Sequence, residues 1–529
     1  MTTESLPLFS QYNSAISSQE DTMEFRLQKR QQDFINNTED FSTIKENSMS
    51  NELSLGENSI NLIFKQRRLK QNLPSIETIY SLKEKISIPQ EWYEKCEKSI
   101  FDISNFSKIL SAFKSNNDIQ KKFFGLIGIK KLILLPESPV QELLNEGITQ
   151  ELIILLELNS NPEFQFESLL CLTYLITKIN KEVKYIILKQ AIKKLYKIFD
   201  SKIEEIKSQA ALFSGNLANE SSQIRDLLIN EKIYDKILTI IASTNQKKLI
   251  KNCFWAIGNF FRIKPIMPYD IAKKCIKIIA RNLFFLQDDK EFLYDACFIL
   301  CFITENYKEG IKELMELEIL ENIIKLLDCN IPYIQITSLR LIGNIASGNA
   351  NQTQKLIDLG LLSQLKKTIF NPKKSIRKET AWILSNIAAG TQKQVENLIT
   401  EDFLLIFQKI IEFDESDVMK ECIWAMANLT NVKNPILMKK ILEQGILLTM
   451  NNCLMFDDAK NLAVNLEALG NLLFFGKNNK IDGVNPVVKE MERIGMVDLL
   501  EKLQTHPFEV VYEKSLKLLL EYFDVQYND

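Results

Sequence analysis

An asparagine that ends a helical apolar stretch recurs about every 42 residues along this chain of 529 residues. The recurrence runs through Asn216 (SGN), Asn259 (WAIGN), Asn344 (RLIGN), Asn386 (WILSN), Asn428 (WAMAN) and Asn471 (ALGN). The steps are 43, 85, 42, 42 and 43 residues, and the double step passes a position held by Phe302. One unit of this length has two or three helices and cannot bury its own apolar face. The units must therefore stack, as armadillo or HEAT repeats do.

A second set of residues repeats in the same register. Gly147, Gly360, Gly445 and Gly495 are expected at the joint before the next repeat, with steps of 213, 85 and 50 residues. The first two steps equal five and two repeats, and the last includes an insertion near 476–487. The sequence therefore predicts an all-α, armadillo-type, right-handed superhelical solenoid of about ten repeats over residues 100–525.

Residues 1–85 differ from the repeats, because they are rich in Ser, Asn, Gln and Glu and show little periodicity. They are expected to form a flexible N-terminal arm. A secretory signal is not expected at the N-terminus, and no apolar run approaches eighteen residues. The nine cysteines are scattered without a C-x-x-C pair, which is typical of reduced core thiols in an intracellular protein. The sequence thus indicates the cytoplasm or the nucleus.

The composition argues against catalysis and against nucleic-acid binding. His506 is the only histidine, so neither histidine acid–base chemistry nor a multi-histidine metal site is expected. Phosphate-binding loops and nucleophile motifs are missing from the sequence. A net charge of −3 and a pI of about 5.8 disfavour a nucleic-acid partner. We therefore expect a protein that is not an enzyme and needs no cofactor.

Three tryptophans each stand four residues before a repeat asparagine, so both side chains share one helix face. The pairs are Trp255/Asn259, Trp382/Asn386 and Trp424/Asn428. A single pair of this kind is usually core packing. A ladder of pairs can instead offer amides to the backbone of an extended peptide, while the indole edges form slots for Lys or Arg stems and their cationic heads.

Acidic residues accompany this ladder. Glu379 and Glu421 each lie three residues before a ladder tryptophan, and Glu291 and Glu305 bracket Phe298. A carboxylate beside an aromatic slot suits a cationic side chain. The alternative is that Glu379 and Glu421 pair with the adjacent cations Arg377, Lys378 and Lys420.

The chain resembles the importin alpha (karyopherin alpha) family of adaptors for nuclear localisation signals, as a divergent member. The resemblance covers residues from about 100 to the end and is carried by NCFWAIGNFFRIKP, SLRLIGNIASGNANQTQ, NPKKSIRKETAWILSNIAAGTQKQVENLI, KECIWAMANLT and VNPVVKEMERIGMVDLLEKLQTHPFEVVYEKSLKLLLEYF. It implies a concave groove with a primary and a secondary pocket for basic peptides. It also implies a role in nuclear import and shuttling between cytoplasm and nucleus.

Matching this chain to the family motif gives two sets of peptide-binding residues. The resemblance implies a nearly complete secondary site of Arg340, Asn344, Thr353, Glu379, Trp382, Asn386, Glu421, Trp424 and Asn428. It implies a degenerate primary site of Asn216, Glu220, Trp255, Asn259, Arg262, Glu291, Phe298 and Glu305. In the primary site Leu212, Leu170 and Tyr174 replace family Trp and Asn residues, and Lys178 replaces a glycine. Cargo binding is therefore expected to depend mainly on the secondary site.

The arm carries the remaining family features. The segment at about 20–37 resembles a degenerate importin-beta-binding helix, with Arg26, Lys29 and Arg30 matching. The cluster Lys65–Lys70 is either an autoinhibitory mimic of cargo or a solvated run of charge. The resemblance implies three partners, namely cargo proteins with localisation signals, importin beta and the export receptor for importin alpha. The alternative function is an armadillo scaffold that binds another extended peptide and has no part in transport.

Overall fold

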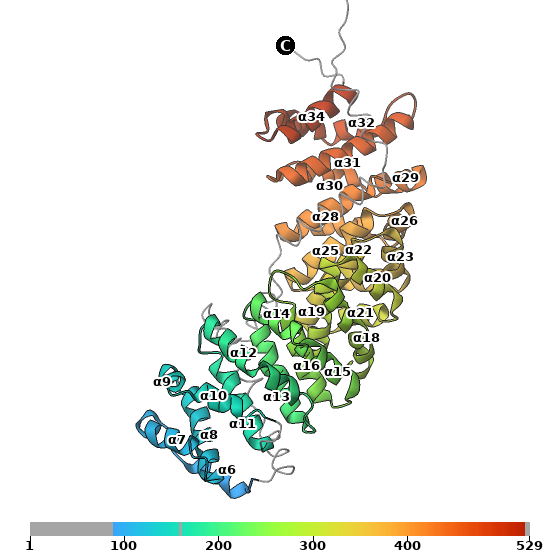
Figure 1. The fold of residues 1–529 in the computed structure, drawn as a ribbon. Coiled ribbons are helices and arrows are strands. Elements are labelled where there is room, and N and C mark those ends of the chain that lie inside the picture. Colours follow the sequence, from blue (N-terminus) through green and yellow to red (C-terminus); the bar gives the residue numbers. More distant parts are fainter. Residues whose placement is uncertain (1–87, 158–160, 524–529) are drawn as a thin grey trace, which may run out of the picture. The chain divides into compact units, whose positions relative to one another are not determined.

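The computed structural model describes residues 88–157 and 161–523 (Figure 1). These residues belong to two compact units, residues 88–303 and residues 304–523. Within the described ranges the regular structure is helical, apart from an isolated bridge between Ile481 and Val484. No helix in these ranges is long and apolar enough to cross a membrane. The expected arm, with Arg26, Lys29, Arg30 and the cluster Lys65–Lys70, lies outside the described residues.

The N-terminal unit begins with a helix that precedes the predicted start of the repeats. Its helices are α6 (Gln90–Lys98), η2 (Ile103–Asn105), α7 (Phe106–Phe113), α8 (Ile119–Leu134), α9 (Val140–Asn145), α10 (Ile148–Ile154), α11 (Pro162–Leu175), α12 (Lys181–Ile198), α13 (Glu204–Ala218), α14 (Ser222–Asn230), α15 (Ile233–Ser243), α16 (Lys247–Phe260), α17 (Tyr269–Ala272), η3 (Lys273–Cys275), α18 (Ile276–Phe285) and α19 (Lys290–Asn306). The last three residues of α19 belong to the C-terminal unit. The helix α6 packs on α8 through the rings of Tyr93 and Phe123, whose centroids are 5.0 Å apart.

The C-terminal unit contains five successive groups of three α-helices. Its helices are α20 (Lys308–Glu316), α21 (Leu320–Lys325), η4 (Leu326–Asp328), α22 (Pro332–Ala346), α23 (Ala350–Asp358), α24 (Leu361–Thr368), α25 (Lys374–Ala388), α26 (Gln392–Thr400), α27 (Phe403–Phe413), α28 (Ser416–Leu429), α29 (Pro435–Glu443), α30 (Ile446–Cys453), α31 (Ala459–Asn478), α32 (Pro486–Arg493), α33 (Met496–Lys502), η5 (Leu503–Thr505) and α34 (Glu509–Tyr522). Each group is one repeat with a first, a second and a third helix. The helix α31 extends to Asn478, into the predicted insertion.

A residue with left-handed backbone separates the first helix of a repeat from the second. Gly147, Gly360, Gly445 and Gly495 have φ angles of 73, 86, 79 and 71°. Lys232 and Asp402 take the same conformation at the corresponding place, with φ of 64 and 58°. Glycine reaches this region without steric cost and commonly ends a helix there. The expected position of these glycines, at the joint between repeats, is therefore wrong, because they lie within the repeat.

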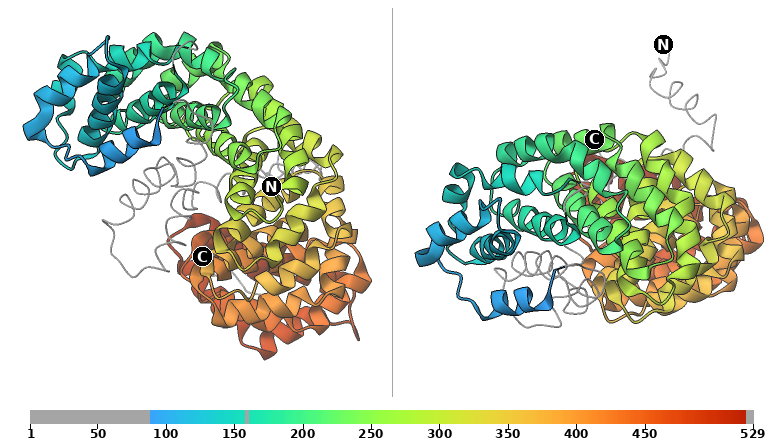
Figure 2. Two further views of the ribbon diagram at one scale, coloured as in Figure 1. Left: turned by 90° about the horizontal axis from the view of Figure 1, so that it is seen from below. Right: turned by 60° about the horizontal axis from the view of Figure 1, so that its bottom comes forward.

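The third helices of successive repeats stack in each unit. In the N-terminal unit α8 packs on α11, α11 on α13, and α13 on α16, and in the C-terminal unit the series runs from α22 through α25, α28 and α31 to α34. Figure 2 shows two further views of the stacked helices, coloured along the sequence. Every residue of α22 from Ile334 to Ala346 is buried. A helix buried on all sides must be the core of the stack, so its polar residues are buried too.

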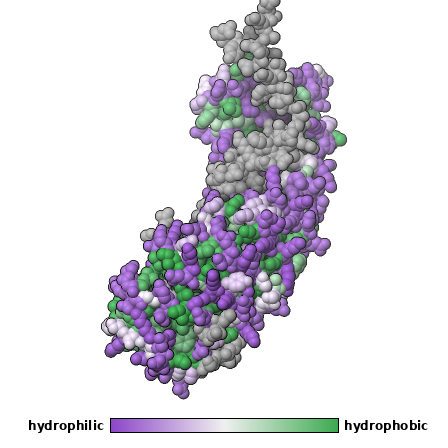
Figure 3. Space-filling view, viewed as in Figure 1, coloured by the Kyte–Doolittle hydropathy of each residue, from purple (hydrophilic) through white to green (hydrophobic). Residues whose placement is uncertain are grey.

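Polar side chains cover most of the face shown in Figure 3, with hydrophobic residues gathered over the N-terminal unit. All nine cysteines are free thiols, and eight of them are buried. Burial raises the pKa of the Cys253 thiol to about 12. A thiol with such a pKa has almost no reactive thiolate at neutral pH, so it acts as a small apolar core residue.

Candidate functional site

Eight of the nine residues of the expected secondary site lie on three neighbouring third helices. Arg340 and Asn344 lie on α22, Glu379, Trp382 and Asn386 on α25, and Glu421, Trp424 and Asn428 on α28, while Thr353 lies on α23. Because α25 packs against both α22 and α28, these residues form one continuous strip across three repeats. Trp424 and Asn428 are half-buried, whereas Trp382 and Asn386 are buried.

Each of two indoles rests on a glycine of the preceding repeat. A Cβ added to Gly343 would lie 2.0 Å from Cζ3 of Trp382, so the ring fills the space that a side chain would need. At Gly215 an added Cβ would lie 3.0 Å from Cζ3 of Trp255. Both glycines directly precede a ladder asparagine, as in the sequences SGN and IGN. This pairing of glycine with the next tryptophan was not predicted, although the recurring Gly-Asn dipeptide is a signal for it.

The ladder asparagines differ in how their amides are used. In the C-terminal unit Asn428 Nδ2 donates to the Ser385 carbonyl at 3.0 Å, and Asn344 Nδ2 donates to Thr304 Oγ1 at 3.2 Å. Asn386 is 1% exposed, and neither its Oδ1 nor its Nδ2 has a hydrogen-bond partner in the described part of the chain. A buried amide without partners is rare and costs free energy, and a ligand that bonded to it would remove that cost.

The carboxylate of Glu379 forms a buried ion pair across the repeat boundary. Arg340 Nε donates to Glu379 Oε2 at 2.8 Å, and Arg340 Nη2 donates to the second carboxylate oxygen. The side chains are 3% and 4% exposed. Of the adjacent cations that the sequence offered as alternative partners, Arg377 bonds instead to Asp414. Glu379 therefore fixes α22 against α25, and any cation of a ligand would join a carboxylate that already has a partner.

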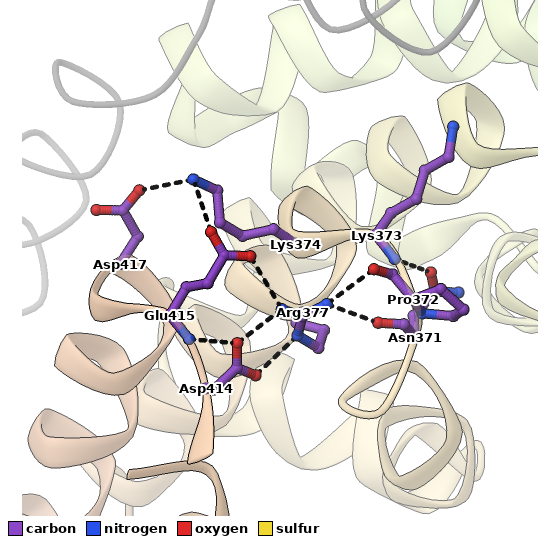
Figure 4. Close-up of polar contacts among 8 residues, drawn as sticks. All are labelled: Asn371, Pro372, Lys373, Lys374, Arg377, Asp414, Glu415 and Asp417. Atoms are coloured by element: carbon purple, nitrogen blue, oxygen red, sulfur yellow. Dashed lines mark hydrogen bonds and ion pairs between the residues drawn. The ribbon is translucent and has the colours of Figure 1, made fainter. Parts of the chain in front are cut away.

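Arg377 joins the start of α25 to the segment before α28 (Figure 4). Its Nε and Nη2 donate to the two carboxylate oxygens of Asp414, both at 2.7 Å. Its Nη1 donates to the carbonyls of Asn371 and Pro372 at 2.9 and 3.0 Å. The bonds to Asp414 hold the pKa of the Arg377 guanidinium above its usual range. This bidentate pair fixes the register of two repeats that carry the strip.

Exposed ion pairs continue the same connection. Lys374 Nζ lies 3.4 Å from a Glu415 oxygen and 3.5 Å from an Asp417 oxygen. Lys420 Nζ lies 2.8 Å from an Asp458 oxygen in the next repeat. Lys420, which the sequence offered as a partner of Glu421, therefore pairs with a carboxylate of the next repeat. Solvent screens such pairs, so each adds little stability.

Replacing Arg377 with glutamine is expected to lower the unfolding free energy of the protein by about 2 kcal/mol, because the buried Asp414 carboxylate loses its charged partner. The melting temperature followed by circular dichroism should fall by about 4–8 °C. Lys373→Gln is the matched control, since Lys373 points away from the cluster in Figure 4. Equal shifts for the two variants would contradict this role of Arg377.

Thr353, the ninth residue of the expected secondary site, stabilises the loop between α22 and α23. Its Oγ1 lies 3.1 Å from the Ala346 carbonyl and 3.3 Å from the Asn349 carbonyl. The Asn349 and Gln352 side chains form a capping box at the start of α23. These contacts fix the end of α22, which carries Asn344.

The residues of the expected primary site occupy three third helices and the loops that follow two of them. Asn216 lies in the last turn of α13, and Glu220 follows that helix. Trp255 and Asn259 lie on α16 with Arg262 just after, and Glu291, Phe298 and Glu305 lie on α19. Asn216 Nδ2 donates to the Leu212 carbonyl at 2.9 Å, and Asn259 Nδ2 donates to the Trp255 carbonyl at 3.1 Å. Both amides thus bond to their own helix, unlike Asn344 and Asn428.

The replacements in the second repeat have visible consequences. Leu170 and Tyr174, which stand at family Trp and Asn positions, are buried on α11. Lys178 is exposed, and its Nζ donates to the Leu135 carbonyl at the end of α8 at 2.8 Å. The cation is therefore held at the helix end, where it satisfies an unpaired carbonyl.

In the described residues no group of His, Cys, Asp and Glu could hold a metal ion.

Comparisons with known proteins identify the repeats and their relatives. The armadillo/beta-catenin-like repeat model matches residues 349–389, and the atypical Arm repeat model matches residues 485–529. Importin subunit alpha-1b of Oryza sativa subsp. japonica is 32% identical over 405 residues, which are 76% of each chain. Importin subunit alpha-3 of Arabidopsis thaliana is 32% identical over 397 residues, 74% of each chain. An engineered protein of the Northeast Structural Genomics Consortium, 21% identical, covers 79% of this chain and 98% of its own with a TM-score of 0.66, and shows the same fold.

Proposed function

The chain belongs to the importin alpha family of nuclear import adaptors, and we propose that it binds Lys/Arg-rich nuclear localisation signals along α25 and α28. Cargo bound there would be linked to importin beta through the segment at 20–37. The empty adaptor would return through the export receptor, so the protein would shuttle between cytoplasm and nucleus. The resemblance of the sequence to the family supports the links to importin beta and to the export receptor.

The observation that carries the proposal is the amide of Asn386. Both of its polar atoms are buried and lack a hydrogen-bond partner within the described residues. An extended peptide offers a backbone N–H and C=O at regular intervals, which is the pair of groups that one carboxamide can bond. Trp382 lies one turn before Asn386 on α25, and Trp424 lies on the adjacent α28. A peptide held by Asn386 would therefore run between two indoles, which suit the stems and cationic heads of Lys and Arg.

Fluorescence anisotropy of labelled monopartite and bipartite localisation peptides tests the proposal on the full chain. We expect a Kd in the micromolar range or below. Asn386→Ala should weaken binding about tenfold, or about 1.4 kcal/mol, because one backbone clamp is lost. It should not lower the melting temperature, since the amide it removes makes no internal bond.

Asn465→Ala provides the matched control for Asn386→Ala. Asn465 is a buried asparagine of α31 whose Nδ2 donates to the Met450 carbonyl at 2.9 Å. Its replacement should lower the melting temperature and leave peptide binding unchanged. Failure of the unmodified chain to bind either peptide would overturn the proposal and favour an armadillo scaffold with a different ligand.

A further inference from the structure

A buried lysine of this chain, Lys184, forms an ion pair with Glu220, the acidic residue near Asn216. Lys184 Nζ lies 2.7 Å from Glu220 Oε2, and the side chains are 8% and 17% exposed. Glu220 follows Asn216 by four residues, which places it just beyond the end of α13. Lys184 lies in the first turn of α12, whose start is fixed by the bond from the Val183 amide to the Asn180 side chain. The ammonium is therefore held beside this carboxylate by a rigid helix.

Two further cations of the N-terminal unit are placed in the same way. Lys251 Nζ lies 2.9 Å from an Asp289 oxygen and 3.3 Å from a Glu291 oxygen. The guanidinium of Arg262 lies over the ring of Phe298, 4.6 Å from its centroid. Glu220, Glu291 and Phe298 are three of the groups expected to receive basic side chains of a ligand. Each already has a cation from this chain.

We propose that Lys184 is a specificity-determining residue, which makes the position beside Asn216 and Glu220 accept an uncharged side chain of a bound peptide rather than Lys or Arg. This inference rests on the proposed function, because it assumes that an extended peptide binds along the third helices. The N-terminal repeats would then contribute backbone contacts from Asn216 and Asn259 and an indole slot at Trp255, without selecting a positive charge at Glu220.

Intramolecular geometry explains why a lysine of cargo would not displace Lys184. A tethered partner has a high effective concentration at its site, and its loss of freedom is already included in folding. A second ammonium placed beside the same carboxylate would also be repelled by the first, in a region from which most water is excluded. A neutral side chain meets neither obstacle. The pair Lys184–Glu220 therefore selects against positive charge instead of for it.

The experiment uses the full chain with Asn386→Ala and Trp424→Ala, so that peptide bound at α25 and α28 contributes little. In this background Lys184→Met should tighten binding of a monopartite localisation peptide about tenfold, because the Lys184 ammonium no longer repels a cation of the peptide beside Glu220. Lys189→Met is the matched control on the same helix, since Lys189 is exposed, and it should change nothing. Adding Glu220→Gln to Lys184→Met should remove the gain.

Equal binding by the Lys184→Met and Lys189→Met variants, both folded by circular dichroism, would overturn the inference. A second measurement avoids any risk to folding. In the background with Lys184 intact, each lysine of the peptide is replaced in turn by norleucine, and one replacement should bind at least as tightly as the parent. A tenfold loss at every position would also overturn the inference. Failure of the proposed function would appear differently, as no peptide binding by the unmodified chain.

Discussion

Replacing Arg340 with methionine is expected to lower the unfolding free energy by about 3–5 kcal/mol, the largest stability loss predicted for a single substitution here. The change leaves the Glu379 carboxylate, 4% exposed, without the guanidinium that donates two hydrogen bonds to it. The loss should appear in urea unfolding followed by circular dichroism. Hydrogen exchange should show increased opening of α22 and α25, because the ion pair joins these two helices.

The double variant Arg340→Met/Glu379→Leu separates the ion pair from the shape of the two side chains. Replacing both partners of a buried pair with apolar residues of similar size is often neutral or stabilising. We therefore expect the double variant to recover most of the stability lost in Arg340→Met. The double variant should bind peptide more weakly than the unmodified chain, because it lacks the Glu379 carboxylate that suits a ligand cation. A double variant as unstable as Arg340→Met would show that packing, and not the unpaired charge, explains the loss.

The solenoid could be predicted from the sequence because residues at equivalent positions of stacked repeats recur at a fixed spacing. A side chain that recurs every 42 or 43 residues must occupy equivalent places in stacked units, so the spacing alone assigns Asn344, Asn386 and Asn428 to one strip. The same logic placed Trp382 and Trp424 beside them. The structure confirms the all-α armadillo repeats.

Contacts between repeats could not be predicted in the same way. Arg340 and Glu379 are 39 residues apart, Lys130 and Glu167 are 37, and Lys184 and Glu220 are 36. These separations fall short of one repeat by different amounts, because each depends on how far one helix is shifted along the next. The pattern of a single helix contains no such information. For the same reason Arg377 could not be assigned to Asp414 from the sequence.

The burial of Trp382 and Asn386 was also not predicted. An amphipathic pattern suggests one exposed face per helix, yet α22 and α25 are buried over most of their length. Third helices contact their own repeat on one side and two further third helices on the others, which leaves little surface free. Polar residues such as Asn386 are therefore buried, and each of them needs a hydrogen-bond partner.

Gly343→Ala is expected to disable the slot at Trp382. The new Cβ would lie 2.0 Å from Cζ3 and 2.6 Å from Cε3 of the indole, so the ring must move. Overpacking of this kind costs about 1–3 kcal/mol of stability. Because the displaced indole no longer flanks Asn386, peptide affinity should fall at least tenfold. Anisotropy titration and thermal unfolding measure the two effects on the same sample.

Replacing the glycine before an earlier ladder asparagine with alanine should raise stability instead of lowering it. Gly258 precedes Asn259 as Gly343 precedes Asn344, but the facing aromatic residue there is Phe298, and an added Cβ would lie 3.9 Å from its nearest ring atom. Gly258→Ala meets no clash and should stabilise helix α16 by up to about 1 kcal/mol. If both alanine variants destabilised the protein equally, the indole could not be the cause.

A smaller ring should rescue Gly343→Ala. Phe298 shows that phenylalanine leaves room for a methyl group above the glycine of the preceding repeat. In the double variant Gly343→Ala/Trp382→Phe the strain should therefore be relieved, and the melting temperature should exceed that of Gly343→Ala alone. Peptide affinity should recover only in part, because a phenyl ring offers a weaker cation–π slot than an indole. The melting temperature would then recover more fully than peptide affinity, which a purely structural role of Trp382 does not predict.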